Sequence, residues 1–170
     1  VVAGCGGGEA VRECLAPLLA HAPRIVLDAD ALNHVARAHE LQRLLRARAG
    51  QGRPSVVTPH PLEAARLLGV TAAAVQADRL AAARALAERL AVVVVLKGSG
   101  TMLATAGTGD VLAGWLGGLW AQQPRADPLR VACAAVWQHG HAADAALAEG
   151  GRHGAPLLAA DLIAVLGATV

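Results

Sequence analysis

The sequence predicts an α/β fold in which a parallel sheet is covered on both faces by helices. Four short runs rich in Val, Ile and Leu, at residues 1–3, 24–27, 55–58 and 92–96, alternate with longer segments of helical pattern. Strands that alternate with helices in this way form βα units, whose connections make the strands parallel. The 170 residues are enough for one domain with a substantial core, so residues 1–170 are expected to form a single domain.

The composition excludes several classes of protein. Ala, Val and Leu dominate, Phe and Tyr are absent, and the net charge is +2 with acids and bases interspersed, so we expect no nucleic-acid partner. No apolar run is long enough for a membrane span and no signal peptide is visible, so we expect no membrane partner. Cys5, Cys14 and Cys133 are odd in number and lack metal-ligand spacing, which favours a reduced, cytoplasmic setting.

A glycine-rich turn, Gly4-Cys5-Gly6-Gly7-Gly8, joins the first strand to the first predicted helix. Such a turn admits either a phosphate or another backbone group. It departs from the dinucleotide-binding fingerprint because Glu9 stands where that motif has Gly or Ala. Asp28 does lie at about the distance downstream expected of a ribose-binding acid, so a dinucleotide site is kept as an alternative.

Two carboxylates follow the second predicted strand, residues 24–27. Asp28 and Asp30 are two apart and would share a face if the segment is extended. Asp28 stands at the carboxyl end of a parallel strand, where ligands gather in open α/β sheets. For Asp30 the simpler interpretation is a cap on a helix over residues 31–48.

His60 lies between two prolines after the third strand, residues 55–58. Pro59 and Pro61 fix its backbone and prevent a helix from beginning before Pro61. A histidine held in this way indicates a functional role, with a solvated side chain as the alternative. A helix over residues 71–90 then leads to the strand at 92–96, whose unbroken apolar run predicts burial on both faces.

Two further stretches indicate phosphate binding. Lys97-Gly98-Ser99-Gly100-Thr101 follows the fourth strand, where a lysine and small residues favour a phosphate site over a solvated lysine. Gly107-Thr108-Gly109-Asp110 precedes an apolar run that predicts a helix from Val111 to Ala121. The N–H groups at that helix terminus favour a phosphate, and Asp110 either caps the helix or accepts a proton.

Two helices complete the chain, at residues 127–149 and from about Pro156 onward. His139 and His141 on the first of them are two residues apart and do not share a helix face, so we predict no metal site there.

These motifs together resemble the ADP-dependent NAD(P)H-hydrate dehydratase family, a branch of the ribokinase-like superfamily. The resemblance rests on the stretches 26–33, 58–61, 97–101 and 107–110, which occur in the family's order, and it extends from Val1 nearly to Val170. It implies a three-layer α/β/α sandwich with a mostly parallel sheet, of which about the first third would precede Val1. It also implies a hairpin between Thr101 and Met102, which is either deleted or missing from the printed sequence.

The resemblance implies roles for particular residues. Asp110 would be the catalytic base. His139 and His141, in the helix at 127–149, would serve helix packing. Cys5 and Gly7 replace the Pro and Leu of the family's first turn, and Leu62 replaces its usual Gly. The substrate-binding residues implied are Gly6, His60, Asp110, Asp28 and Asn33. The nucleotide-binding residues implied are Lys97, Gly98, Ser99, Gly100, Thr101, Gly107, Thr108 and Gly109.

The family's reaction removes water from the S epimer of NAD(P)H hydrate and converts ADP to AMP and phosphate. The resemblance therefore implies NAD(P)H hydrate and ADP as substrates, Mg²⁺ bridging the phosphates, and a cytoplasmic homo-oligomer, with a tetramer expected. An epimerase domain fused upstream is a further expectation. The alternatives are a vitamin-precursor or sugar kinase of the same superfamily, and a nucleotide-binding module without catalysis.

Overall fold

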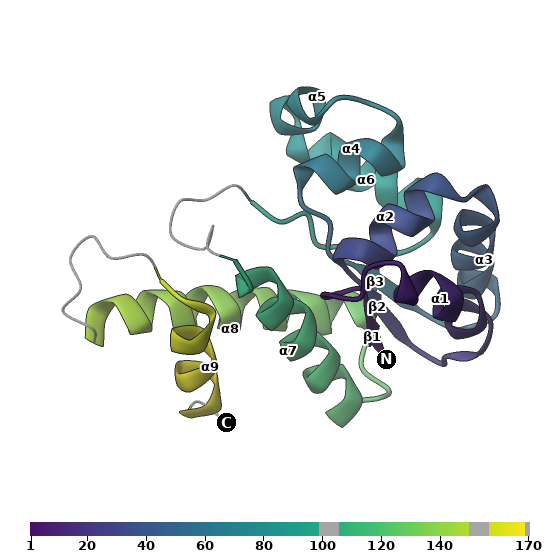
Figure 1. Cartoon of the computed structure of the whole chain (residues 1–170). Coiled ribbons are helices and arrows are strands. Elements are labelled where there is room, and N and C mark those ends of the chain that lie inside the picture. Colours follow the sequence, from purple (N-terminus) through teal and green to yellow (C-terminus); the bar gives the residue numbers. More distant parts are fainter. Residues whose placement is uncertain (99–105, 150–156, 169–170) are drawn as a thin grey trace. The chain divides into compact units, whose positions relative to one another are not determined.

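The computed structural model describes residues 1–98, 106–149 and 157–168. The chain divides into two compact units, an N-terminal unit of residues 1–98 and a C-terminal unit of residues 99–170 (Figure 1). The first contains a sheet and the helices connected to it, and the second is helical in its described part. The position between Thr101 and Met102, where the family's hairpin was expected, lies outside the described residues.

The N-terminal unit is built on a parallel four-stranded sheet in the order β1-β2-β3-β4. The strands are β1 (Val2–Ala3), β2 (Ile25–Leu27), β3 (Ser55–Val57) and β4 (Val93–Val94). Since all strands run the same way, the segments that follow them meet at one edge of the sheet. The prediction of an α/β fold with a parallel sheet is confirmed, and each strand lies within the residues expected.

Burial differs between the central strands and β4. Every residue of β2 and β3 is buried, whereas both residues of β4 are only partly buried. The expectation that the fourth strand is buried on both faces is therefore wrong. In the part of the chain that the structure describes, β4 lies at the edge of the sheet with a neighbour on one side only, and its apolar run is less enclosed.

The helix predicted over residues 31–48 is two helices. They are α2 (Ala29–Arg37) and α3 (His39–Gly50), and they follow α1 (Ala10–His21). The chain is extended at Ala38, where Gln42 of α3 donates two hydrogen bonds to the last carbonyls of α2. The Ala38 N–H also donates to the Val35 carbonyl at 3.4 Å, so the Gln42 amide adds to the hydrogen bonds that end α2 at the break.

The helix predicted over residues 71–90 is also interrupted. The chain forms α4 (Pro61–Leu68), α5 (Ala72–Ala77) and α6 (Arg79–Leu90). Asp78 is the residue between α5 and α6, and its carboxylate accepts a hydrogen bond from the Ala81 N–H at 2.9 Å. The aspartate therefore begins a new helix as its N-cap and does not continue the previous one.

The core of the N-terminal unit is made of small aliphatic side chains, as the composition predicts. Fully buried leucines from α1, α2, α3 and α6 pack against β2 and β3; they include Leu15, Leu32, Leu45 and Leu86. Arg48 is buried beside them and donates to the Ser55 hydroxyl at 2.8 Å and to the Leu19 carbonyl at 2.6 Å. Burial, and then the charge of Arg53, lower the pKa of the Arg48 guanidinium.

The C-terminal unit consists of α7 (Thr108–Gln122), α8 (Pro128–Glu149) and α9 (Ala159–Ala168) in its described part. The three helices contact one another, and their shared core includes Ala142, Ala143, Leu162 and Leu166 (Figure 1). Helix α7 begins three residues before the predicted start at Val111. None of the helices in the described ranges combines the length and apolar character needed to cross a membrane.

Candidate functional site

Asp28 lies directly after β2 and is the N-cap of α2. Its Oδ1 accepts a hydrogen bond from the Ala29 N–H at 2.8 Å, and its side chain is fully buried. Its Oδ2 is buried without a hydrogen-bond partner among the described residues. The prediction that Asp30 caps this helix is wrong, because the helix begins at Ala29 and Asp30 instead accepts the Gly8 N–H at 2.8 Å.

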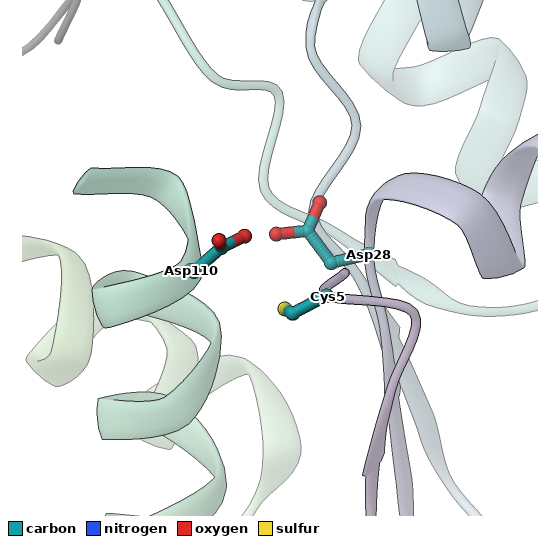
Figure 2. A group of neighbouring side chains, drawn as sticks. All are labelled: Cys5, Asp28 and Asp110. Atoms are coloured by element: carbon teal, nitrogen blue, oxygen red, sulfur yellow. The ribbon is translucent and has the colours of Figure 1, made fainter. Parts of the chain in front are cut away.

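The glycine-rich turn lies against this aspartate. Gly4 has φ +123°, and a Cβ built there would lie 1.8 Å from the Asp28 carbonyl oxygen, so only glycine fits. Gly6 has φ +64°, and no atom of the described residues lies within 4 Å of a Cβ built there, so the space beside it is open in this part of the chain. Figure 2 shows the Cys5 side chain beside Asp28, with the Sγ within 4.8 Å of a carboxylate oxygen. At Gly4 the turn therefore admits another backbone group, which is one of the two alternatives that the sequence left open.

Lys97 forms an ion pair with Asp28. The Nζ lies 2.6 Å from Oδ1, and the lysine side chain is 18% exposed. The backbone of Lys97 is also held: its N–H donates to the Pro59 carbonyl at 2.8 Å, and Arg79 of α6 donates to its carbonyl at 3.0 Å. A short, charge-assisted contact of this kind fixes the ammonium at the carboxyl edge of the sheet.

One signal in the sequence marks Lys97, and none marks Arg79, which supports it. Of the 15 basic residues other than histidine, Lys97 is the one lysine and the rest are arginines. A compact ammonium and a planar guanidinium bind phosphate differently, so a single exception in an arginine-rich chain marks a special position. Arg79 was not singled out because it lies 18 residues earlier on another element.

His60 is the N-cap of α4. Its Nδ1 accepts hydrogen bonds from the N–H groups of Leu62 and Glu63, and the Glu63 carboxylate accepts the His60 N–H at 2.9 Å. Because Nδ1 is an acceptor, the ring proton of the neutral imidazole is on Nε2, which lies 3.3 Å from a Glu63 oxygen. The side chain is 43% exposed, so the imidazole is partly accessible to a ligand.

The structure does not bring every predicted residue to the Asp28–Lys97 pair. The Asn33 Oδ1 accepts a hydrogen bond from Arg66 of α4 at 2.6 Å, which ties α2 to α4. Gly98 is exposed, and Ser99, Gly100 and Thr101 lie outside the described residues.

In the C-terminal unit, the predicted phosphate loop forms the start of α7. Gly107 is the N-cap in the left-handed region, with φ +89°, and as a glycine it has no side chain with which to cap the helix. The interpretation of Asp110 as the N-cap is therefore wrong. Asp110 is exposed in the first turn of α7 (Figure 2), and Gly109 is partly buried. An uncapped helix N-terminus offers N–H groups to an anion, and the carboxylate beside them can accept a proton.

Mg²⁺ is the metal that the resemblance implies, and Asp28 offers the test of its fit in the N-terminal unit. Its Oδ2 is a buried carboxylate oxygen without a partner among the described residues, which is a suitable donor type. However, the Lys97 ammonium already balances this charge at 2.6 Å. Asp28 therefore does not fit a protein cage for Mg²⁺.

Comparison with known proteins agrees with the resemblance seen in the sequence. Residues 1–165 match the family model described as NAD(P)H-hydrate dehydratase. The chain is 43% identical to the ADP-dependent (S)-NAD(P)H-hydrate dehydratase of Neisseria meningitidis, over 84% of this chain and 53% of that protein. It is 39% identical to the bifunctional NAD(P)H-hydrate repair enzyme of Escherichia coli, over 81% of this chain and 28% of that protein.

A solved structure shares the fold. The ADP/ATP-dependent NAD(P)H-hydrate dehydratase of Bacillus subtilis, co-crystallised with ATP and Mg²⁺, matches with a TM-score of 0.76 and 29% identity, over 98% of this chain and 63% of that one. The chain thus spans about half the length of its Neisseria relative and less than a third of the bifunctional one. On the family match and these identities, the chain belongs to the NAD(P)H-hydrate dehydratase family.

Proposed function

We propose that the protein restores NADH and NADPH by removing the added water from the S epimer of their hydrates, with ADP converted to AMP and phosphate. The observation that carries the proposal is the start of α7, where left-handed Gly107 opens an uncapped helix and Asp110 lies in the first turn. N–H groups at such a terminus stabilise a transferring phosphoryl group. The names of the Neisseria and Bacillus relatives support the substrates.

Asp110 is the proposed general base. It accepts the proton of the added hydroxyl while that oxygen attacks the terminal phosphoryl group of ADP, and AMP leaves. The carbon–oxygen bond then breaks, phosphate leaves, and loss of a ring proton restores the dihydronicotinamide. The N–H groups at residues 107–109 hold the transferring group, so the chemistry depends on positioning and charge neutralisation.

Lys97 is the proposed phosphate-binding cation of the N-terminal unit. Its ammonium is preorganised by Asp28, and its backbone is held by Pro59 and Arg79. A cation that is already fixed neutralises phosphate charge without reorganisation during the reaction. We propose that Gly98, Ser99, Gly100 and Thr101 continue this nucleotide-binding segment, and that Mg²⁺ enters with the phosphates of the nucleotide.

The hydrate is the proposed ligand of Gly6, His60, Asn33 and Asp28. The open space beside Gly6 and the partly exposed His60 side chain support direct contact. Asp28 is proposed to contribute its Oδ2, which has no hydrogen-bond partner among the described residues, because its Oδ1 is already occupied by the Lys97 ammonium.

The wider setting is also proposed. The bifunctional relatives support an epimerase activity in the same polypeptide as the dehydratase. We further propose a cytoplasmic homo-oligomer, which can be tested by measuring the mass of the native protein.

The test is turnover of prepared hydrates. Purified protein, ADP, Mg²⁺ and hydrated NADH or NADPH are expected to give an increase in the dihydronicotinamide absorbance, with AMP and phosphate formed in equal amounts. Phosphorylation of a pyrimidine or thiazole alcohol, with the hydrates unchanged, would establish the kinase instead. ADP binding without turnover of either kind would establish a non-catalytic nucleotide-binding module.

A further inference from the structure

His139 of α8 contacts the backbone at the start of α7. Its Nε2 lies 2.9 Å from the carbonyl oxygen of Thr108, and both side chains are buried, with exposed fractions of 6% and 3%. A carbonyl oxygen only accepts hydrogen bonds, so Nε2 carries the proton and donates. In buried surroundings such a bond is stronger than at the surface.

Thr108 is the first residue of α7 and stands two residues before Asp110. Within a helix its carbonyl accepts the N–H of the residue four positions later, so the imidazole is a second donor to the same oxygen. The contact therefore joins the middle of α8 to the turn that carries the proposed base.

The start of α7 needs support from outside itself. Its N-cap is Gly107, which has no side chain that could fix the first turn by a hydrogen bond. Among the described residues, the His139 bond on Thr108 supports this turn, and Ala159 of α9 lies so near that its Cβ would be 3.3 Å from a Cβ built at Gly107. Of these two, His139 makes the directional, polar contact.

We propose that His139 is a positioning residue, which holds the first turn of α7 so that the Asp110 carboxylate and the helix N–H groups keep the geometry that the reaction requires. This inference rests on the proposed function, because it assigns a task within the same site. It gives a role in the reaction to a histidine whose sequence pattern indicates packing alone.

The electrostatics of the contact agree with this role. Burial lowers the pKa of the His139 imidazole, and the bond to the Thr108 carbonyl opposes that shift in part. The ring is therefore neutral near pH 7 and places no additional positive charge beneath the phosphate-binding terminus. The neutral ring still donates from Nε2, so the contact is maintained at that pH.

The experiment compares His139→Leu with His139→Gln in the full chain. Gln places an N–H donor near the position of Nε2, whereas Leu fills the volume without a donor. For Leu we expect a loss in kcat of about tenfold or more, because small displacements of a catalytic group are costly. For Gln, kcat should recover most of that loss, and KM for ADP should change less than kcat in both variants.

Two controls separate positioning from stability. His141→Leu removes an exposed histidine that stacks on Trp137 of the same helix. Leu116→Ala removes a fully buried side chain from α7 without touching Thr108, and should lower the melting temperature without a matching loss of kcat in the folded protein. Equal kcat in wild type and His139→Leu, measured well below both melting temperatures, would overturn the inference.

A second readout does not depend on activity. Hydrogen exchange is measured on the peptide that covers residues 107–116 in wild type and in both His139 variants. Faster exchange in His139→Leu, with protection restored in His139→Gln, supports the contact; unchanged exchange in the Leu variant contradicts it. If wild type leaves the hydrates unchanged while exchange responds as expected, the proposed function fails and the structural contact stands.

Discussion

The ammonium of Lys97 and the carboxylate of Asp28 lie 2.6 Å apart although the residues are 69 positions apart in the sequence. Asp28 follows β2 and Lys97 follows β4, so the pair connects the ends of two strands that flank β3. Because the sheet is parallel, both residues arrive at the same edge. The pair is therefore a product of the topology and also fixes the position of the chain's one lysine.

Asp28→Asn is expected to release that lysine. Asn keeps a cap for α2 but leaves the partly buried ammonium without its counter-charge, so the free energy of unfolding should fall by about 1–3 kcal/mol. Amine-selective labelling of Lys97, followed by peptide mass spectrometry, should become faster. Asp30→Asn is the matched control, because its carboxylate binds the Gly8 N–H and not a cation. Equal labelling rates in wild type and Asp28→Asn would show that the pair does not control the ammonium.

ADP is expected to protect Lys97 from the same reagent. A phosphate bound at Lys97 shields the side chain from the reagent, which reacts with the free amine, whereas adenosine, which lacks phosphates, should not protect it. Labelling of the Lys97 peptide is measured over a series of ADP concentrations. If saturating ADP leaves the labelling rate unchanged, Lys97 does not bind the nucleotide phosphates.

Asp110→Asn is expected to reduce kcat by ~10²–10⁴-fold, the usual contribution of a general base. Asp110 is exposed and is not the N-cap of α7, so the fold should tolerate a nearly isosteric amide at this position. ADP affinity and the melting temperature should stay close to those of wild type. Asp144→Asn, an exposed aspartate on α8, serves as the control. A variant with most of the wild-type kcat would remove Asp110 from the mechanism.

Gly107→Ala and Gly114→Ala should act in opposite directions on stability. Gly107 has φ +89° and faces the Cβ of Ala159, so alanine there costs about 1–2 kcal/mol and disturbs the phosphate-binding turn. Gly114 lies within α7 with nothing within 4 Å of an added Cβ, so alanine should stabilise the helix by up to about 1 kcal/mol. Urea unfolding and kcat are measured for both variants. Equal stability of the two would contradict the backbone geometry at Gly107.

The buried imidazole of His139 should make stability depend on pH. Its folded-state pKa is lowered from 6.5, mainly by burial, so the unfolded chain binds more protons below that pH. The free energy of unfolding should therefore decrease as pH falls through 6.5 and continue to fall until the folded-state pKa is reached. Urea midpoints between about pH 5 and about pH 8 test this, with His139→Gln as the reference. Parallel curves for the two proteins would exclude a contribution from His139.

The alternation of apolar runs with helical segments was sufficient to predict the strands and the parallel sheet. The helix boundaries were harder to predict, because local capping decides them. Asp78 and Gln42 interrupt segments whose composition is helical throughout, and α7, with Gly107 as its N-cap, begins three residues before its apolar run. These boundaries depend on local hydrogen bonds at Asp78 and Gln42 and on the left-handed backbone at Gly107, which periodicity does not reveal.

The candidate site was partly predictable for a similar reason. Asp28 and Lys97 were selected because they follow strands, and the structure brings them together. Arg79 and His139 were not selected, because each acts on a backbone carbonyl of a distant segment. A carbonyl acceptor is the same at every position, so the sequence contains no sign of such a partner.

The division into two units has a consequence for spectroscopy. The three tryptophans, Trp115, Trp120 and Trp137, all belong to residues 99–170, and the chain has no Tyr or Phe. Intrinsic fluorescence therefore reports on the C-terminal unit alone, whereas far-ultraviolet circular dichroism reports on the helices of both. A tryptophan introduced in the N-terminal unit would give that unit its own signal. Coincident transitions of the two signals would then identify a single cooperative unfolding event.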